Sequence, residues 1–267
     1  MSRKTRSGEK ARTGVLVTGA SSGIGKAIAF EFAAREHDVF LVARNEQRLA
    51  ELAQRCRAEH SVNAAYLVCD LSKPDAADTV HNWIRKQGFS VDVLVNNAGF
   101  DIFGPVSETD AKQESELLAV NIHTLTMLTK KFLPRMIKRG RGRVLNIGST
   151  GSLIPTPLNA VYCASKAYVL SFSAALSEEC LGTGVTVTCA CPGATRSRFH
   201  ERAGMEQVVL MKYPVMEAEA VARACVNACL AGRRMLVVGT FNKLSMYAMS
   251  LMPLSWRVKL AKQFTKQ

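Results

Sequence analysis

The sequence predicts an α/β protein: one doubly wound domain in which a parallel seven-stranded sheet carries helices on both faces. Short runs rich in Val, Leu and Ile recur along the chain, and longer helical patterns separate them. Runs that are apolar throughout indicate strands buried on both faces, which a parallel sheet requires. No internal repeat or linker rich in Ser, Gly and Pro divides the chain, and 267 residues with 48% hydrophobic composition suit one core.

Seven segments fit the strands of this sheet, and turn signals bound them. Gly88 and Gly140 follow helical stretches, Gly182 closes a third, and Pro74 with Asp75 opens another. In chain order the expected strands are GVLVTGA from Gly14, DVFLVA from Asp38, AAYLVC from Ala64, VDVLVN from Val91, GRVLNIG from Gly142, GVTVTCA from Gly184 and RMLVVG from Arg234.

The formal net charge of +13 is concentrated at the two ends of the chain. Residues 1–13 carry a net charge of +4 and residues 233–267 carry +7, so only +2 remains for the rest. We expect a flexible basic head over residues 1–12, a main domain over residues 13–239 and a basic C-terminal extension over residues 240–267. A nearly neutral body without a basic patch interleaved with aromatics argues against a nucleic-acid partner.

The two ends leave alternatives open. The head MSRKTRSGEKART lacks the apolar stretch of a secretory signal, and either a flexible lead-in or a mitochondrial presequence fits it. The uncharged run Leu244 to Trp256 has 13 residues, whereas a membrane-spanning helix needs about 20. With the basic segment after it, this run either lies on a membrane surface, packs on the body or packs on another subunit.

The eight cysteines show no spacing typical of a metal site. Cys189 and Cys191 are two residues apart and Cys225 and Cys229 are four apart, so each pair shares one face of its element. We expect structural thiols, no metal and a reducing, cytoplasmic location, with peripheral membrane contact as the alternative for the tail.

The first expected strand leads into a glycine-rich turn, TGASSGIG from Thr18 to Gly25, and then into a helical pattern. Glycines at 19, 23 and 25 allow a sharp turn, close approach of a ligand and packing of the helix on the strand. A helix N-terminus in this position presents free N–H groups to a pyrophosphate. The expected contacts of the dinucleotide in this turn are Gly19, Ser21, Ser22, Gly23, Ile24 and Gly25.

The end of the second expected strand bears on which nicotinamide cofactor the protein uses. A protein that binds NAD places an acid there for the ribose 2′-hydroxyl, whereas this chain has Arg44 directly after Ala43. An arginine pairs with a 2′-phosphate, so the sequence favours NADP(H). Arg48 either assists this contact or belongs to a solvated helix face.

Seven motifs together resemble the short-chain dehydrogenase/reductase family over about residues 13–239. They are TGASSGIG with its GxxxGxG spacing, CDL at 69–71, NNAG at 96–99, Asn121, Ser149, YCASK at 162–166 and CPG at 191–193. The resemblance implies a Rossmann domain, with Tyr162 as the acid/base and Lys166, Ser149 and Asn121 beside it. It also implies cofactor contacts from Asp70, Leu71, Asn97, Ala98, Gly99, Tyr162, Lys166, Pro192, Gly193 and Thr195.

Tyr162 and Lys166 are four residues apart, so a helix places them on one face, either as a surface pair or for chemistry. Reduction of a carbonyl needs a hydride on carbon and a proton on oxygen, and a free tyrosine holds its proton with a pKa of about 10. An ammonium nearby would lower that pKa and also bind the nicotinamide ribose. Ser149 would hold the substrate oxygen or cap a helix. Asn121 would support a water linked to Lys166, by family resemblance, or act as a buried hydrogen-bonding group.

Three loops should surround the nicotinamide: FDIFGPV after Gly99, TGSLIPTPLNAV after Ser149 and a long segment after Gly193. The first two are apolar, which favours a lipophilic ketone or aldehyde, or a β-keto acyl chain. In the third, Thr195 or Ser197 would bind the carboxamide. Its basic side chains fit either a lid that meets phosphate groups or a solvated face; they are Arg196, Arg198, His200, Arg202 and Lys212.

The function predicted by these residues is NADP(H)-dependent interconversion of a carbonyl and an alcohol on an apolar substrate. One alternative is a β-ketoacyl reductase of lipid metabolism, and TRSRFHERAGM with the basic tail resembles a branch of ketoacyl and steroid-type reductases. Another is a regulatory protein that binds NADP(H) without turnover, although the intact tyrosine, lysine, serine and asparagine argue against it. Family resemblance also implies a homodimer or homotetramer.

Overall fold

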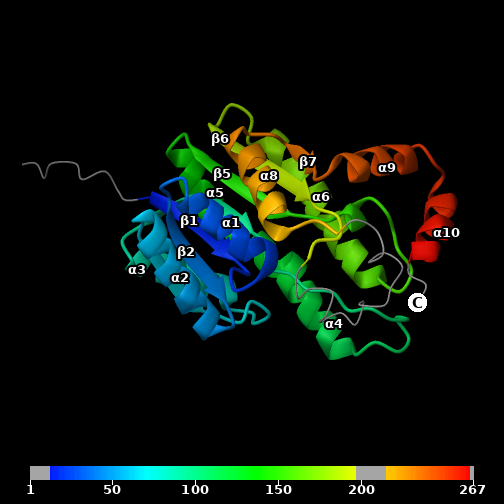
Figure 1. Cartoon of the computed structure of the whole chain (residues 1–267), viewed down its shortest axis with the longest axis horizontal. Coiled ribbons are helices and arrows are strands. Elements are labelled where there is room, and N and C mark those ends of the chain that lie inside the picture. Colours follow the sequence, from blue (N-terminus) through cyan, green and yellow to red (C-terminus); the bar gives the residue numbers. More distant parts are fainter. Residues whose placement is uncertain (1–12, 197–214, 265–267) are drawn as a thin grey trace, which may run out of the picture.

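The computed structural model describes residues 13–196 and 215–264. Within these ranges the strands form one parallel sheet in the order β3-β2-β1-β4-β5-β6-β7, which confirms the predicted fold class (Figure 1). The strands are β1 Thr13–Thr18, β2 Asp38–Ala43, β3 Ala64–Val68, β4 Ser90–Asn96, β5 Gly142–Ile147, β6 Val185–Cys191 and β7 Met235–Val237.

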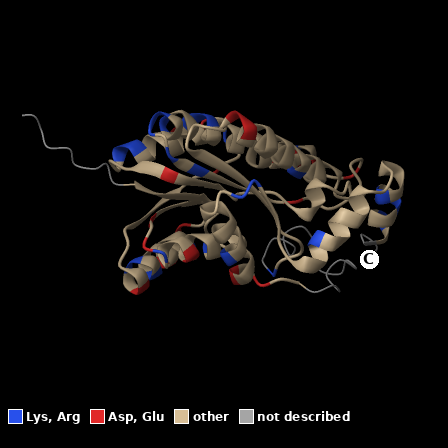
Figure 2. Ribbon diagram, turned by 90° about the horizontal axis from the view of Figure 1, so that it is seen from above, with Lys and Arg blue, Asp and Glu red and all other residues tan. Residues whose placement is uncertain are grey.

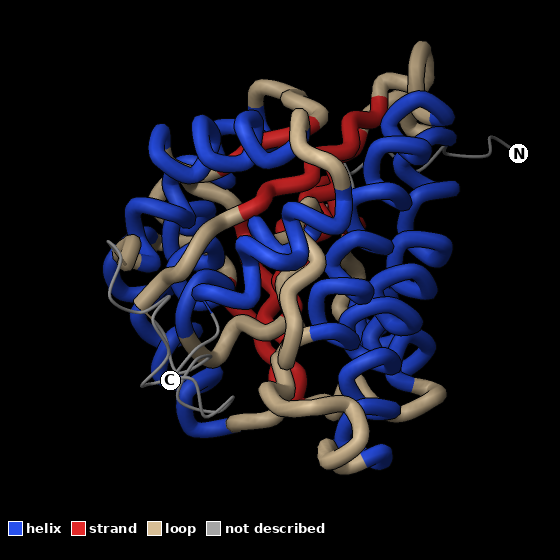
Figure 3. The backbone as a smooth tube through the Cα atoms, turned by 90° about the vertical axis from the view of Figure 1, so that its right-hand side faces the viewer, coloured by secondary structure: helices blue, strands red, loops and turns tan. Residues whose placement is uncertain are grey.

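Helices cover both faces of the sheet, so the molecule has three layers (Figures 1 and 3). A π-helical turn, η1 Ala119–Thr124, joins α4 to α5, and a 3-10 turn, η2 Thr150–Ser152, precedes α6. The α-helices are α1 Gly23–Ala33, α2 Glu46–His60, α3 Ala76–Lys86, α4 Ala111–Leu118, α5 Leu125–Lys138, α6 Ala160–Glu179, α8 Ala218–Leu230, α9 Thr240–Ser250 and α10 Leu254–Phe264.

Alternate residues of each central strand feed two separate cores. Val15 and Val17 of β1 pack with α1, α2 and α8, whereas Leu16 between them packs with α3, α5 and α6. All three side chains are fully buried. This two-sided burial explains why the strands read as continuous apolar runs instead of alternating ones.

Glycines end the helices where the sequence predicts. Gly88, Gly140 and Gly182 all have positive φ, between +67° and +75°, in the left-handed region that glycine enters without strain. Asp75 stands at the N-terminus of α3, as expected. The expected seventh strand is shorter than predicted, because only Met235–Val237 pair with β6 at the sheet edge.

The eight cysteines are buried free thiols, in agreement with their prediction as small apolar residues. In the described part of the chain, no three His, Cys, Asp or Glu side chains gather as metal ligands would. None of the helices within residues 13–196 and 215–264 has both the length and the apolar character needed to cross a bilayer. The predicted extension holds α9 and α10, while the predicted flexible head lies outside the described residues.

The strand order reverses beside β1, which pairs with β2 on one side and with β4 on the other. The connections that follow β1 and β4 therefore leave toward opposite faces of the sheet. This is the position at which open α/β sheets form a ligand crevice. The predicted site residues follow the carboxyl ends of these strands and their neighbours.

Candidate active site

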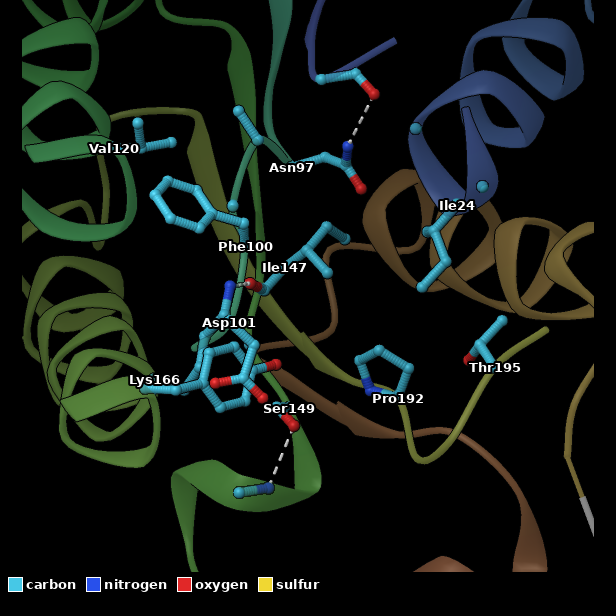
Figure 4. A pocket seen from close by; sticks show the side chains of 18 of the residues that line it. Ile24, Asn97, Phe100, Asp101, Val120, Ile147, Ser149, Lys166, Pro192 and Thr195 are labelled. Carbon is cyan, nitrogen blue, oxygen red and sulfur yellow. Dashed lines mark hydrogen bonds between the residues drawn. The ribbon is translucent and has the colours of Figure 1, made fainter. Parts of the chain in front are cut away.

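A cavity of about 350 Å³ opens at the carboxyl ends of the strands (Figure 4). Every residue predicted to contact the cofactor lines it, from Gly19 after β1 to Thr195 after β6. Ser149, Tyr162 and Lys166 line the same cavity, but Asn121 does not. Residues spread over most of the chain are therefore brought to one pocket, and their individual roles remain predictions.

The glycine-rich turn between β1 and α1 is tightly packed. Gly19 has φ +67°, and a Cβ at this position would lie 2.8 Å from the Cα of Ala98. A Cβ at Gly25 would lie 2.2 Å from Nδ2 of Asn97 and 2.4 Å from the carbonyl oxygen of Gly19. Gly25 is thus required by the packing of α1 on the turn, and Gly19 by both its conformation and its neighbour.

Thr18 and Asn97 fasten this turn to the end of β4. The Thr18 hydroxyl donates to the carbonyl of Val95 at 3.1 Å and accepts from the N–H groups of Asn97 and Ala98. The Asn97 side-chain amide donates to the carbonyls of Thr18, at 2.9 Å, and Gly19. The family resemblance implied a cofactor contact for Asn97, and the sequence analysis assigned no role to Thr18, although a threonine that ends a buried strand is a visible signal.

The N-terminus of α1 is open toward the cavity. Ser22 stands at the N-cap position, its side chain makes no capping hydrogen bond, and no acidic residue lies in the first turn. The first N–H groups of the helix and its partial positive charge therefore face a ligand, and the cradle fits a pyrophosphate.

Arg44 and Asp70 stand at the adjacent ends of β2 and β3, and both line the cavity. Arg44 is exposed, and its guanidinium lies near enough to Asp70 to influence it electrostatically. Partial burial raises the pKa of Asp70, but hydrogen bonds from the Ser72 N–H and hydroxyl, together with the charge of Arg44, outweigh burial and lower it. Asn45, directly after Arg44, caps α2 by accepting from the Arg48 N–H, and Arg48 does not reach the cavity.

Tyr162 and Lys166 lie one turn apart near the N-terminus of α6, as predicted. The Lys166 ammonium is 5.8 Å from the centroid of the Tyr162 ring, is almost completely buried and donates to the carbonyl of Ile147 at 2.9 Å. A pair with a buried ammonium and a partly buried phenol, both lining a cavity, is not the exposed surface pair that the spacing alone also allowed.

Burial dominates the titration of this pair. Burial lowers the pKa of Lys166 to about 8, although the neighbouring Cys189, Cys191 and Asp101 act in the opposite direction. Burial also raises the pKa of Tyr162, and the charge of Asp101 raises it further, while a hydrogen bond with Ser149 lowers it. Burial is therefore the largest influence on the pKa of Tyr162 in this arrangement, and the expectation that Lys166 lowers that pKa stays a prediction.

Ser149 both caps a turn and faces Tyr162. Its hydroxyl accepts from the Gly151 N–H at 3.0 Å, and its own N–H donates to Ser152, a reciprocal capping pair at η2. The same hydroxyl reaches the phenol of Tyr162. The predicted cap is confirmed, and its geometry leaves the hydroxyl facing the phenol, while the active-site role of Ser149 stays a prediction.

Asn121 stands behind the cavity in the π-helical turn η1. Its amide donates to the Ser165 hydroxyl at 3.0 Å and to the Phe100 carbonyl, and its Oδ1 accepts from the Phe100 N–H. Ser165 in turn donates to the carbonyl of Tyr162. Asn121 therefore ties the loop after β4 to the start of α6, in agreement with a buried hydrogen-bonding group.

Asp101 is a site residue that sequence reasoning missed, since FDIFGPV was judged apolar. Its side chain is 5% exposed, lines the cavity and lies with Lys166 and Ser149 toward the end away from Ile24 (Figure 4). Burial raises the pKa of Asp101 to about 7, although a hydrogen bond from the Ile102 N–H and the charge of Lys166 both act to lower it. Its Oδ1 has no hydrogen-bond partner among the described residues. An aspartate within an apolar loop was the available signal.

The far side of the cavity follows β6. Pro192, Gly193 and Thr195 line it, and the Thr195 hydroxyl donates to the Gly193 carbonyl at 3.0 Å. Arg196 is ion-paired with Glu217 at 3.1 Å. Five other residues named for this loop lie outside the described residues: Ser197, Arg198, His200, Arg202 and Lys212.

The substrate end of the cavity is mainly apolar, as predicted from two of the loops. Phe100 comes from the first loop and Ile154 from the second, and α9 and α10 add Met249 and Ala261. The lining also includes polar side chains, among them Asp101, Glu116, Thr150, Thr156 and Asn159. An apolar wall around a small polar centre suits a lipophilic ligand held by one oxygen.

A cradle for a dinucleotide beside a tyrosine, a serine and a buried lysine defines a nucleotide-binding oxidoreductase of the Rossmann class. The family model of short chain dehydrogenases matches residues 13–207. The chain belongs to the short-chain dehydrogenase/reductase family.

Three relatives illustrate the range of this family. The chain is 36% identical over 184 residues to a very-long-chain 3-oxoacyl-CoA reductase of Laccaria bicolor, a match that covers 67% of this chain and 54% of the relative. A solved short-chain dehydrogenase from Sphingobium yanoikuyae in complex with NADPH is 33% identical, with TM-score 0.77 over 90% of this chain and 96% of that one. A bulky-bulky ketone specific alcohol dehydrogenase from Comamonas testosteroni is 28% identical, with TM-score 0.74 and coverage of 91% and 95%. The matched region spans about half the length of the 3-oxoacyl-CoA reductase.

Proposed function

We propose that the protein is an NADP(H)-dependent oxidoreductase that interconverts a carbonyl and an alcohol on an apolar substrate, with Tyr162 as general acid/base. The observation that carries this proposal is the convergence of Ser149, Tyr162 and Lys166 on the cavity that the glycine-rich turn also lines. A lysine and a serine beside a phenol in this cavity suit the transfer of a proton next to the cofactor.

The choice of NADP(H) rests on the ends of β2 and β3. Arg44 is exposed at the rim of the cavity, and no acidic residue directly follows β2 to repel a 2′-phosphate. The carboxylate of Asp70 is held by Ser72 and faces the same rim, where it suits a contact with the adenine region. The NADPH complex of the Sphingobium yanoikuyae relative is consistent with this preference.

In the direction of reduction, bound NADPH supplies the hydride to the carbonyl carbon. Tyr162 donates its proton to the carbonyl oxygen, and the Ser149 hydroxyl holds that oxygen as negative charge develops on it. Because burial raises the pKa of Tyr162, the phenol is protonated at neutral pH and ready to donate. Lys166 then stabilises the phenolate until it is reprotonated. Asn121 holds the start of α6 against the loop after β4 through its hydrogen bonds to Ser165 and Phe100.

The apolar substrate end favours a lipophilic ketone or aldehyde. A β-ketoacyl thioester is a second candidate, supported by the likeness to the 3-oxoacyl-CoA reductase of Laccaria bicolor and by the same apolar wall. Family resemblance supports a homodimer or homotetramer as the assembly.

Turnover of NADPH and NADH by the purified protein tests the proposal across medium-chain ketones, aldehydes, steroids and β-ketoacyl thioesters. We expect NADPH-dependent reduction of at least one apolar carbonyl, with Tyr162→Phe binding NADPH normally but reducing nothing. A Tyr162→Phe protein that keeps most of its activity would remove Tyr162 from the acid/base role. Binding of NADPH without turnover on the whole panel would instead favour a regulatory protein.

A further inference from the structure

The two C-terminal helices present an apolar stripe to solvent. Leu244, Tyr247 and Leu251 are spaced to lie on one face of α9, and they are 71%, 67% and 73% exposed. Trp256 of α10 is 64% exposed and adds a large aromatic side chain to the apolar surface of these two helices. Seven of the fourteen large hydrophobic residues exposed in the described ranges belong to these helices and the turn between them; they are Phe241, Leu244, Tyr247, Leu251, Leu254, Trp256 and Leu260.

The charge around this stripe has one sign. Lys243, Arg257, Lys259 and Lys262 lie on the same two helices, and residues 233–267 contain no Asp or Glu. Figure 2 shows Lys and Arg on the helices at this end of the molecule. An apolar stripe with tyrosine and tryptophan, on helices whose charged side chains are all cations, is complementary to the interface of an anionic bilayer.

A second copy of the chain fits this surface less well. A twofold contact through this surface would place the basic side chains of α9 and α10 opposite the same side chains of the second copy. Residues 233–267 provide no acidic partner for them on either side. Like charges facing each other weaken such a contact. Phospholipid headgroups instead supply the missing negative charge.

The stripe adjoins the substrate end of the cavity. The opposite face of α9 buries Met246 and Met249, and Met249 lines the cavity together with Ala261 of α10. The helices are fixed to the body at Asn242, whose amide donates to the Val238 carbonyl at 2.8 Å and packs against Gly193. A membrane that contacts the stripe would therefore lie beside the wall through which an apolar substrate reaches the site.

We propose that the exposed face of α9 and α10 docks on an anionic lipid surface and so brings the substrate end of the cavity to the bilayer. Docking on a membrane does not depend on the proposed function, but the use of docking for substrate delivery rests on that function. Its test measures binding and not turnover, so failure of one proposal is distinguishable from failure of the other.

Co-sedimentation of the full chain with vesicles tests this surface. The vesicles are phosphatidylcholine alone, or phosphatidylcholine with equimolar phosphatidylserine. We expect the protein to sediment with the anionic vesicles and to be released by salt. Leu244→Asp should weaken binding at least about tenfold, because it removes an exposed apolar side chain that would enter the bilayer and adds a charge that the anionic lipids repel. Leu181→Asp is the matched control, since Leu181 is 59% exposed after α6, outside the C-terminal helices.

Charge reversal supplies a second pair of variants that leaves the apolar stripe intact. Lys259→Glu should weaken binding to anionic vesicles, whereas Lys86→Glu on α3 should not. Equal sedimentation with both kinds of vesicle, or equal losses for Leu181→Asp and Leu244→Asp, would overturn the proposal. A protein that does not bind phosphatidylserine vesicles, and that forms a dimer dissociated by Leu244→Asp but not by the other variants, would also overturn the proposal. That result would assign the stripe to a contact with a second copy of the chain.

Discussion

Replacing Asp101 with Asn should make the protein more stable at alkaline pH and leave it nearly unchanged in acid. Burial raises the pKa of Asp101 to about 7 from an ordinary value of 3.8. The folded state therefore favours the protonated carboxyl, and this advantage is fully present below about pH 4 and lost as the pH rises toward 7. Each pKa unit corresponds to about 1.4 kcal/mol, so the whole change approaches about 4 kcal/mol.

The side-chain amide that this substitution introduces would be neutral at every pH and can still accept from the Ile102 N–H. Urea unfolding of wild type and Asp101→Asn, followed by tryptophan fluorescence, measures the free energy of unfolding from about pH 4 to about pH 8. The titration of Lys166 is common to both proteins, so most of it cancels in the difference. Curves that run parallel over this range would refute the assignment of a raised pKa to Asp101.

The remaining predictions concern the cofactor, the turn and the acid/base pair. Arg44→Asp should weaken NADPH binding at least about tenfold and favour NADH, measured by fluorescence titration; an unchanged preference would place the 2′-phosphate elsewhere. Gly25→Ala should lower the unfolding free energy by about 1 to 3 kcal/mol and weaken cofactor binding, because its Cβ has backbone 2.4 Å away; thermal melting with and without NADPH measures both effects, and a normal melting temperature would contradict this packing. Since the charge of Asp101 raises the pKa of Tyr162, the alkaline rise of alcohol oxidation should move to lower pH in Asp101→Asn; an unmoved pH profile would mean that Tyr162 does not sense Asp101.

The sheet and the positions of its strands could be predicted because burial on both faces leaves an unmistakable apolar run. The turn glycines could be predicted for a similar reason, since few other residues tolerate the conformation of Gly19 or the packing of Gly25. The motif residues were brought to one cavity because parallel strands place their carboxyl ends at the same edge of the sheet.

Other features of the site depend on distant contacts that no local pattern contains. The hydroxyl of Thr18 acts across 77 residues on the Val95 carbonyl, and Asp101 is buried only because neighbouring elements close over its loop. The pKa of Tyr162 could not be judged from the spacing of Lys166, because the degree of desolvation is set by the whole cavity. Asn121 proved to stand behind the cavity, since a π-helical turn between α4 and α5 directs its amide toward Ser165.

The contact of Asn242 with Gly193 limits how this protein can be shortened or recombined. A Cβ on Gly193 would lie 2.4 Å from the Asn242 amide nitrogen, so the loop after β6 and the first turn of α9 pack closely against each other at position 193. Truncating the chain near residue 239 would remove Met249 and Ala261 from the wall of the cavity and leave that loop without its support. A chimaera that exchanges the C-terminal helices should therefore carry positions 193 and 242 as one unit.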